Sequence, residues 1–300
     1  MHHGWAQLAE PTRTPAIVNA AAGTAAAARE ALDASGAFDV HEVPPAEICD
    51  TMKRFVQAGA KRVLIAGGDG TIATAAAALL DTSTELAILP GGTLNHFARD
   101  LGISTVAAEA VELATSHGTR TVDVGVVNGR VFLNTSSVGG YVRYVRTREK
   151  LERHLGYGLA SFLAALRMAT SVRRMVVEIE VEGRTKIFRT PLVFIGVGER
   201  ELRFPVLGRR VNEGKRGLHV MVVKGRSRLR FIAIGATAIL RGLDAVSRTG
   251  NFDDIIADRL RITMNSAGWV ALDGEVALLD TPLEYELRRG ALSVVCPPPE

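Results

Sequence analysis

Cysteine, aromatic residues and long apolar runs are all scarce in this sequence of 300 residues. Its two cysteines, Cys49 and Cys296, are too few for a disulfide framework or a zinc site. The longest apolar run, Phe231 to Leu240, is about half the length that spans a bilayer. The first residues lack a basic region followed by an apolar run, so we expect no secretory signal. We therefore expect a cytoplasmic protein whose membrane contact, if any, is peripheral, at the inner membrane surface.

Two common nucleotide-binding motifs are also missing. The chain contains neither a G-x-x-x-x-G-K-[ST] loop nor a G-x-G-x-x-G dinucleotide fingerprint. A phosphate site that lacks the lysine of the G-x-x-x-x-G-K-[ST] loop needs another cation, and a metal ion is the obvious one.

Charge is distributed unevenly along the chain. Residues 1–125 hold 8 Lys/Arg and 14 Asp/Glu, a balance of −6, whereas the remainder holds 28 and 18, a balance of +10. A basic second half suits an anionic partner such as a membrane surface, a phosphate or a nucleic acid, although a solvated surface explains it equally well. With 5% aromatic residues, the chain offers no stacking platform for bases, so we expect no nucleic-acid partner.

The hydrophobic pattern predicts two domains. Up to about residue 120, apolar strands at 16–19, 38–43, 62–66 and 86–89 alternate with helical segments at 20–29, 47–57 and 72–80, which indicates a parallel sheet covered on both faces. Beyond it, Asn128-Gly129 and Glu182-Gly183 separate β-rich runs and predict hairpins. Further strands are expected at 186–197, 218–223, 260–264, 269–272, 283–287 and 292–295, with helices at 159–171 and 228–243.

We thus expect an α/β fold with a nucleotide-binding domain at 14–122 and a β-rich substrate domain at 123–282. The segment 283–300 is expected to return to the first domain.

One glycine-rich segment follows a buried strand and opens a helix. It consists of Gly67, Gly68, Asp69, Gly70 and Thr71. Glycines let a phosphate approach the backbone, and amides at a helix N-terminus favour anions. Asp69 would repel a phosphate unless a cation such as Mg²⁺ lies between them. Taken alone, the segment is better explained as a glycine-rich turn with Asp69 as a helix cap, and it is the strand before it and the helix after it that favour a phosphate site.

A second loop and helix follow the next strand, from Pro90 to Gly102. Thr93 is placed to cap the helix or to hold a phosphate. Asn95 and Arg99 would lie near the first loop if the two preceding strands are neighbours in the sheet. His96 has no partner at metal-ligand spacing and is expected to be a surface or capping histidine.

These motifs together resemble the diacylglycerol kinase catalytic family, which includes bacterial lipid kinases and sphingosine and ceramide kinases. The first loop matches V-x-x-x-G-G-D-G-T, the second L-P-x-G-T-x-N-x-F-A-R-x-L-G, and Asp273-Gly274-Glu275 resembles the late D-G-E motif of that family. Ile17-Val18-Asn19 resembles its first strand. In isolation, Asp273-Gly274 would simply indicate a turn.

The resemblance implies an ATP- and Mg²⁺-dependent kinase of a diacylglycerol-like or sphingoid lipid, with ATP between an α/β domain and a β-sandwich domain. The nucleotide would contact Asn19, residues 67–71, Thr93 and Asn95, and Asp69 would hold the metal ion. Asp273 or Glu275 would be the general base, because a carboxylate can accept the proton that an alcohol loses during phosphoryl transfer. The choice between them stays open, and we favour Glu275.

Three positions depart from the family pattern. Where the family usually has Asn-Pro after the first strand, this chain has Asn19-Ala20. Where the second loop frequently has Asn-Asp, this chain has Asn95-His96. Where many bacterial members have D-G-x-L in the second domain, this chain has Lys215-Arg216-Gly217-Leu218. In that segment the family's aspartate serves an auxiliary Mg²⁺ site. Arginine has no acceptor atom for a cation, so we expect this auxiliary metal to be missing.

Other functions remain open at this stage. An NAD kinase-like enzyme for a soluble substrate shares the G-G-D-G-T loop and usually carries a later Asn-Glu pair, for which Asn212-Glu213 is a candidate. A catalytically silent regulator that binds ATP or lipid would suit the His96 and Arg216 departures. The segments 156–171 and 224–231 place basic residues beside apolar ones and are candidates for lipid approach, or ordinary helix surface. The oligomeric state, a homodimer included, is not determined.

Overall fold

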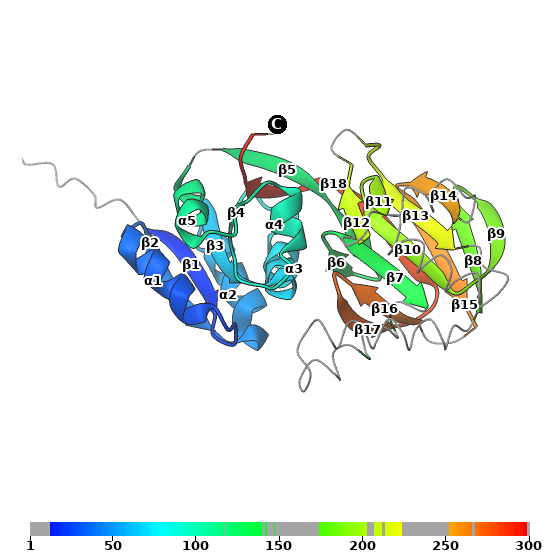
Figure 1. Cartoon of the computed structure of the whole chain (residues 1–300), viewed down its shortest axis with the longest axis horizontal. Helices are drawn as coiled ribbons and strands as arrows, with labels where there is room; N and C mark the ends of the chain where they lie inside the picture. Colours follow the sequence, from blue (N-terminus) through cyan, green and yellow to red (C-terminus); the bar gives the residue numbers. More distant parts are fainter. Residues whose placement is uncertain are drawn as a thin grey trace, which may run out of the picture. The chain divides into compact units, whose positions relative to one another are not determined.

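The structure is a computed structural model that describes residues 13–116, 118–139, 142, 147, 174–202, 207–211, 214–223, 252–265 and 268–298. The chain forms two compact units (Figure 1). Unit 1 contains the residues up to Thr121 together with those from Leu292 onward, and unit 2 contains Val122–Ala291. The chain therefore passes between the units twice, within two long strands, β5 (Thr119–Val127) and β18 (Leu283–Val295).

Unit 1 is built on a parallel sheet. Its strands are ordered β2-β1-β3-β4, and the end of β18 lies beside β4, with Val294 opposite Leu86. The four strands are β1 (Thr14–Asn19), β2 (Phe38–Val43), β3 (Arg62–Gly67) and β4 (Glu85–Pro90). The middle of β1 and β3 is almost uniformly apolar and at most 2% exposed, as expected for strands covered on both faces.

Helices cover both faces of this sheet. They are α1 (Ala25–Ser35), α2 (Ile48–Gln57) after a short 3₁₀ turn η1 (Pro45–Glu47), α3 (Asp69–Leu79), α4 (His96–Asp100) and α5 (Ala107–Thr115). Helices α1 and α5 share a core with alternate residues of β1, β3 and β4. Helices α2 and α3 pack against each other and against β1, β3 and β4. The alternation expected from the sequence is confirmed, although α1 begins later than expected because Asn19 first closes a turn with Ala21.

Unit 2 is an antiparallel β-sandwich. One sheet has the order β14-β13-β10-β7-β16-β17. The other continues from β18 through β15 and β8 to β9, with β5 beside β18 and β6 beside β5. Both sheets contribute to one apolar core, in which Phe132 and Tyr285 meet edge to face. The strands of the first sheet are β7 (Thr135–Gly139), β10 (Leu192–Val197), β13 (Leu218–Val223), β14 (Phe252–Ala257), β16 (Gly268–Leu272) and β17 (Glu275–Leu279). The others are β6 (Arg130–Phe132), β8 (Met175–Val181), β9 (Arg184–Thr190) and β15 (Arg259–Met264), with a separate pair β11 (Arg200–Leu202) and β12 (Leu207–Arg210).

The two predicted hairpins are confirmed, and two strand predictions are wrong in detail. Asn128-Gly129 joins β5 to β6 and Glu182-Gly183 joins β8 to β9, with positive φ at all four residues. The expected strand 186–197 is divided at Pro191, so that β9 and β10 belong to different sheets. The expected strands 283–287 and 292–295 are a single strand, β18.

Several expected features fall on residues outside the described ranges. These are the helices at 159–171 and 228–243, the lipid-approach segments at 156–171 and 224–231, and the Asn212-Glu213 pair. Among the residues that the structure describes, no helix is long and apolar enough to cross a membrane.

Candidate functional site

The first glycine-rich loop lies at the carboxyl end of β3. The strand ends at Gly67, Gly68 occupies the N-cap position, and α3 begins at Asp69. The first amides of an α-helix have no acceptor within the helix, so those that follow Gly68 are available to an anion. This is the edge at which open α/β sheets bind their ligands.

The second glycine-rich loop lies beside the first. Strands β3 and β4 are parallel neighbours, with Gly67 opposite Pro90, and Gly91 N–H donates to the Gly67 carbonyl at 2.8 Å. A Cβ atom on Gly92 would lie 2.8 Å from the Cα of Gly68, which is closer than real Cβ contacts come. Glycine at this point is therefore required by the close approach of two backbones, and the two loops form one continuous surface.

Asn19 connects the first strand to this surface. Its amide nitrogen donates to the Thr71 hydroxyl at 2.7 Å, and its amide oxygen accepts the Ala21 N–H at 2.9 Å. The bond to Thr71 places Asn19 beside the first turn of α3, at the carboxyl ends of β1 and β3, and the bond to Ala21 fixes the turn after β1. The structure thus brings Asn19 to residues 67–71.

The remaining residues of the second loop differ in exposure. Asn95 is 5% exposed, adopts φ 49°, and exchanges two side-chain hydrogen bonds with Gly92, at 2.7 and 2.8 Å. Its amide group is thus occupied in shaping the loop. The Asp69 carboxylate accepts a long bond, 3.4 Å, from Phe97 N–H, and the Thr93 side chain is exposed with no hydrogen bond to another described residue.

In unit 2, the Asp-Gly-Glu segment is the turn of the β16–β17 hairpin. Asp273 and Gly274 have φ values of 46° and 91°, as a two-residue hairpin turn with Asp-Gly requires. The Asp273 carboxylate accepts three backbone N–H bonds, from Leu133 at 2.6 Å, Asn134 at 2.8 Å and Thr135 at 2.9 Å. Asp273 therefore fastens the turn to the connection between β6 and β7.

Glu275 differs from Asp273. It is the first residue of β17, its side chain is exposed, and no hydrogen bond or ion pair engages it among the described residues. The structure thus separates two carboxylates that the sequence could not distinguish. One has its oxygen atoms committed to backbone amides, whereas the other is accessible.

Sequence analysis missed a buried carboxylate, Asp123. Its side chain is 3% exposed, accepts a two-pronged bond from the Arg216 guanidinium, and accepts Gly290 N–H at 2.8 Å. The hydrogen bond to Asp123 raises the pKa of Arg216. A charged residue inside the apolar run Val122-Asp123-Val124 was the available signal. The Arg216 guanidinium thus places a cation beside Asp123, and a guanidinium has no acceptor atom for a metal ion. Across the described part of the chain, no three His, Cys, Asp or Glu side chains gather as a metal site.

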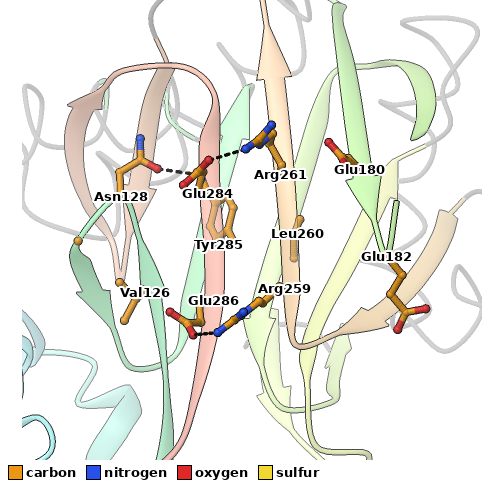
Figure 2. Close-up of a pocket in the computed structure, with 11 residues that line it drawn as sticks. Val126, Asn128, Glu180, Glu182, Arg259, Leu260, Arg261, Glu284, Tyr285 and Glu286 are labelled. Atoms are coloured by element: carbon orange, nitrogen blue, oxygen red, sulfur yellow. Dashed lines mark hydrogen bonds and ion pairs between the residues drawn. The ribbon is translucent and has the colours of Figure 1, made fainter. Parts of the chain in front are cut away.

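A hollow of about 520 Å³ lies elsewhere in unit 2, on the face of the sheet formed by β5, β18, β15 and β8 (Figure 2). Its floor carries cross-strand ion pairs, Arg259 with Glu286 at 2.7 Å and Arg261 with Glu284 at 2.8 Å. These charges neutralise one another on exposed strands, and none of the lining residues was predicted as a site residue. We therefore regard it as part of the charged outer face of the sandwich.

Known proteins resemble both the sequence and the fold. The model of the diacylglycerol kinase catalytic domain matches residues 15–127. A diacylglycerol kinase of Bacillus subtilis (strain 168) is 32% identical over 226 residues, which cover 71% of this chain and 70% of that protein. A Pseudomonas syringae pv. syringae (strain B728a) protein named "Probable lipid kinase YegS-like" is 35% identical over 145 residues, or 47% of this chain and 46% of that protein.

A solved structure of a diacylglycerol kinase from Bacillus anthracis str. Sterne superposes with a TM-score of 0.69 at 22% identity, covering 95% of this chain and 97% of that one. At that identity, the likeness concerns the fold alone.

Proposed function

Because this chain belongs to the diacylglycerol kinase catalytic-domain family, we propose that it transfers the γ-phosphoryl group of ATP to a hydroxyl group of a lipid. The acceptor would be a diacylglycerol-like or sphingoid lipid, taken up by peripheral membrane contact, and Mg²⁺ would be the metal ion. The observation that carries this proposal is the pair of glycine loops that meet, without room for a Cβ atom, beside the N-terminus of α3.

The residues of unit 1 fit a nucleotide phosphate and its metal ion. The N-terminal amides of α3 would bind phosphate oxygens, and Gly68 and Gly92 leave the backbone bare at this point. Asp69 would hold Mg²⁺, because a carboxylate oxygen is a ligand that this ion prefers. When bound, the ion neutralises charge on the phosphates. Asn19 would fix the orientation of Thr71 through the bond between their side chains.

We propose Glu275 as the general base, and Asp273 as the residue that positions it. The hydroxyl oxygen of the lipid forms a bond to the γ-phosphorus, the bond from that phosphorus to the bridging oxygen of ADP breaks, and the hydroxyl proton passes to the Glu275 carboxylate. The products are a phosphorylated lipid and ADP. Glu275 suits this role because its carboxylate is exposed, whereas Asp273 is bound to three amides.

The test is a kinase assay with Mg-ATP and a panel of acceptors that contains diacylglycerol, a sphingoid base and NAD. The wild type is expected to label a lipid and not NAD, and EDTA should abolish labelling. Glu275→Gln should lower kcat by at least about 100-fold, the usual contribution of a positioned acid or base. Asp69→Asn should also lower kcat, because it removes the proposed ligand of the metal ion. Asp280→Asn, an exposed carboxylate beyond the end of β17, is the matched control and should keep full activity.

Three outcomes would contradict the proposal or its site assignment. Labelling of NAD in preference to every lipid would assign the chain to a soluble substrate. ATP binding without transfer to any acceptor would make it a silent binder. Equal activity of the wild type, Asp69→Asn and Glu275→Gln would show that the site residues are wrongly assigned.

A further inference from the structure

The turn after β1 reaches the second glycine loop through Thr24. The Thr24 hydroxyl donates a hydrogen bond to the carbonyl of Gly91 at 3.1 Å. Thr24 is also the N-cap residue of α1, but its side chain makes no capping bond to that helix. A threonine in this position normally accepts a hydrogen bond from an amide of its own helix. The hydroxyl of Thr24 is therefore directed to the glycine loop rather than to α1.

This bond holds one peptide group of the loop. The Gly91 carbonyl and the Gly92 N–H belong to the same planar trans peptide, on which they point in opposite directions. Thr24 binds the carbonyl, and the Asn95 side-chain oxygen accepts the N–H at 2.8 Å. The preceding peptide is held as well, because Gly91 N–H donates to the Gly67 carbonyl at 2.8 Å. Rotation of the peptide between the two loop glycines is thus restrained from both sides.

The orientation of that peptide sets the spacing between the two glycine loops. Gly92 lies so close to Gly68 that an added Cβ atom would be 2.8 Å from the Gly68 Cα. This contact brings the second loop to the N-terminus of α3, where we expect the nucleotide phosphates. Rotation of the peptide would move the Gly92 backbone out of this contact. Thr24 can therefore affect the nucleotide site through the loop.

Gly91 supplies a second, independent observation. Its φ is not positive, so the backbone at this position would accept an alanine. A Cβ atom there would nevertheless collide with the hydroxyl oxygen of Thr24, whereas its next neighbour, the Gly67 Cα, would be 3.5 Å away, an ordinary contact. The room that glycine leaves at this position is thus occupied by the Thr24 hydroxyl.

We propose that Thr24 is a positioning residue for the nucleotide, whose hydroxyl holds the peptide between Gly91 and Gly92 in the orientation that binding of the ATP phosphates requires. This inference rests on the proposed kinase function. Thr24 acts through the loop and not as a catalytic residue. Its hydroxyl is the group that matters, so serine should replace it and valine should not.

Calorimetric titration with Mg-ATP tests the role of the hydroxyl. Thr24→Val keeps the shape of the side chain and should raise the Kd for ATP about fivefold, the effect of one hydrogen bond. Thr24→Ser should bind ATP as the wild type does. In the kinase assay, Thr24→Val should raise the KM for ATP by the same factor and leave kcat and the KM for the lipid unchanged. Its urea midpoint should stay close to that of the wild type, because the Thr24 side chain is exposed and caps no amide of α1.

A double-mutant cycle tests the contact with Gly91. Gly91→Ala displaces the hydroxyl and should also weaken ATP binding about fivefold. In a Thr24→Ala background the methyl group fits and the bond is already absent, so Gly91→Ala should weaken binding no further. Gly67→Ala is the matched control, because its methyl group would meet the side chain of Thr71 instead of Thr24. Its effect on the Kd should be the same in both backgrounds.

The outcomes separate this inference from the proposed function. Wild-type ATP affinity in Thr24→Val would overturn the inference and leave the kinase proposal intact, and so would effects of Thr24→Ala and Gly91→Ala that multiply in the double variant. A wild type that binds ATP and shows the expected coupling, but phosphorylates no lipid, would refute the proposed function and support the inference. A wild type that binds no ATP would overturn both.

Discussion

Replacing Asp273 by asparagine tests whether this carboxylate stabilises the turn while Glu275 acts as the proposed general base. Asparagine adopts positive φ as readily as aspartate and is common in two-residue hairpin turns, so the β16–β17 turn should keep its backbone. The charge disappears, and one carboxylate oxygen becomes an NH₂ group. If the remaining oxygen keeps the N–H groups of Asn134 and Thr135, the new NH₂ faces the N–H of Leu133, and two donors are opposed.

The magnitude follows from those three bonds. A hydrogen bond to a charged group contributes about 1.5–3 kcal/mol, and about half that when the partner is neutral. Asp273→Asn loses one charged bond and weakens two, which would sum to more than 3 kcal/mol in a dry site. The turn is partly exposed, so water replaces part of the loss. We expect a decrease of about 2 kcal/mol in the free energy of unfolding of unit 2.

Urea unfolding followed by Trp269 fluorescence in a Trp5→Phe background measures this change, because Trp269 lies in β16, the strand that leads into the turn. With a slope of about 2 kcal/mol per molar urea, the midpoint should fall by about 1 M. Glu275→Gln should leave the midpoint unchanged and abolish turnover, and Asp280→Asn should change neither. If Asp273→Asn is as stable as the wild type and inactive while Glu275→Gln stays active, Asp273 is the base and our assignment is wrong.

Three further predictions follow from the contacts described above. Arg216→Met removes the guanidinium from the buried Asp123 carboxylate and should cost about 1–3 kcal/mol of stability, less than for a fully buried pair because the Arg216 side chain is 58% exposed. The exposed pair broken by Arg289→Met should cost less than about 1 kcal/mol in the same urea titration. Gly92→Ala inserts a methyl group between the two loops and should weaken ATP binding at least about tenfold by calorimetry, while Gly23→Ala, with nothing within 4 Å of its Cβ, should bind as the wild type. Burial lowers the pKa of His219 below 6.5 in the folded chain. As the pH falls, the unfolded chain therefore binds a proton at this histidine before the folded chain does. The free energy of unfolding should decrease below pH 6.5 by at most about 1.4 kcal/mol per pH unit. In His219→Gln, the free energy of unfolding measured from pH 5 to 8 should decrease less steeply at low pH than in the wild type. The same pH dependence in both proteins would show that His219 does not cause the decrease.

Local sequence signals account for much of unit 1 and for the hairpins. Uniformly apolar runs such as Val63–Ala66 are found in buried parallel strands, and the two hairpins of unit 2 form at Asn-Gly and Gly-containing turns that favour positive φ. The sequence placed each glycine loop after a strand but left open whether those two strands are neighbours, and the structure shows that they are. The apolar strands and the hairpins depend on residues that are close in sequence, which is why they were predictable.

The roles of individual site residues depend on contacts that sequence does not display. Asp273 is bound by amides about 140 positions earlier, and Asp123 is paired with a guanidinium 93 positions later. Without those partners, Asp273 looked equivalent to Glu275, and Asp123 was overlooked. The division of one expected strand at Pro191 has the same origin, because the choice of sheet for each half is made by the core of the sandwich.

The return of β18 to unit 1 has a consequence for the order of folding during synthesis. Leu292, Val294 and Val295 are buried in unit 1, and Val295 shares a core with Ala16 and Leu64. On the ribosome, these residues emerge only after the whole of unit 2. Unit 1 therefore stays open along the edge of β4 while the sandwich is made, and an unpaired strand edge of this kind invites aggregation. Unit 1, which is synthesised first, can thus complete its sheet only after unit 2 has been synthesised.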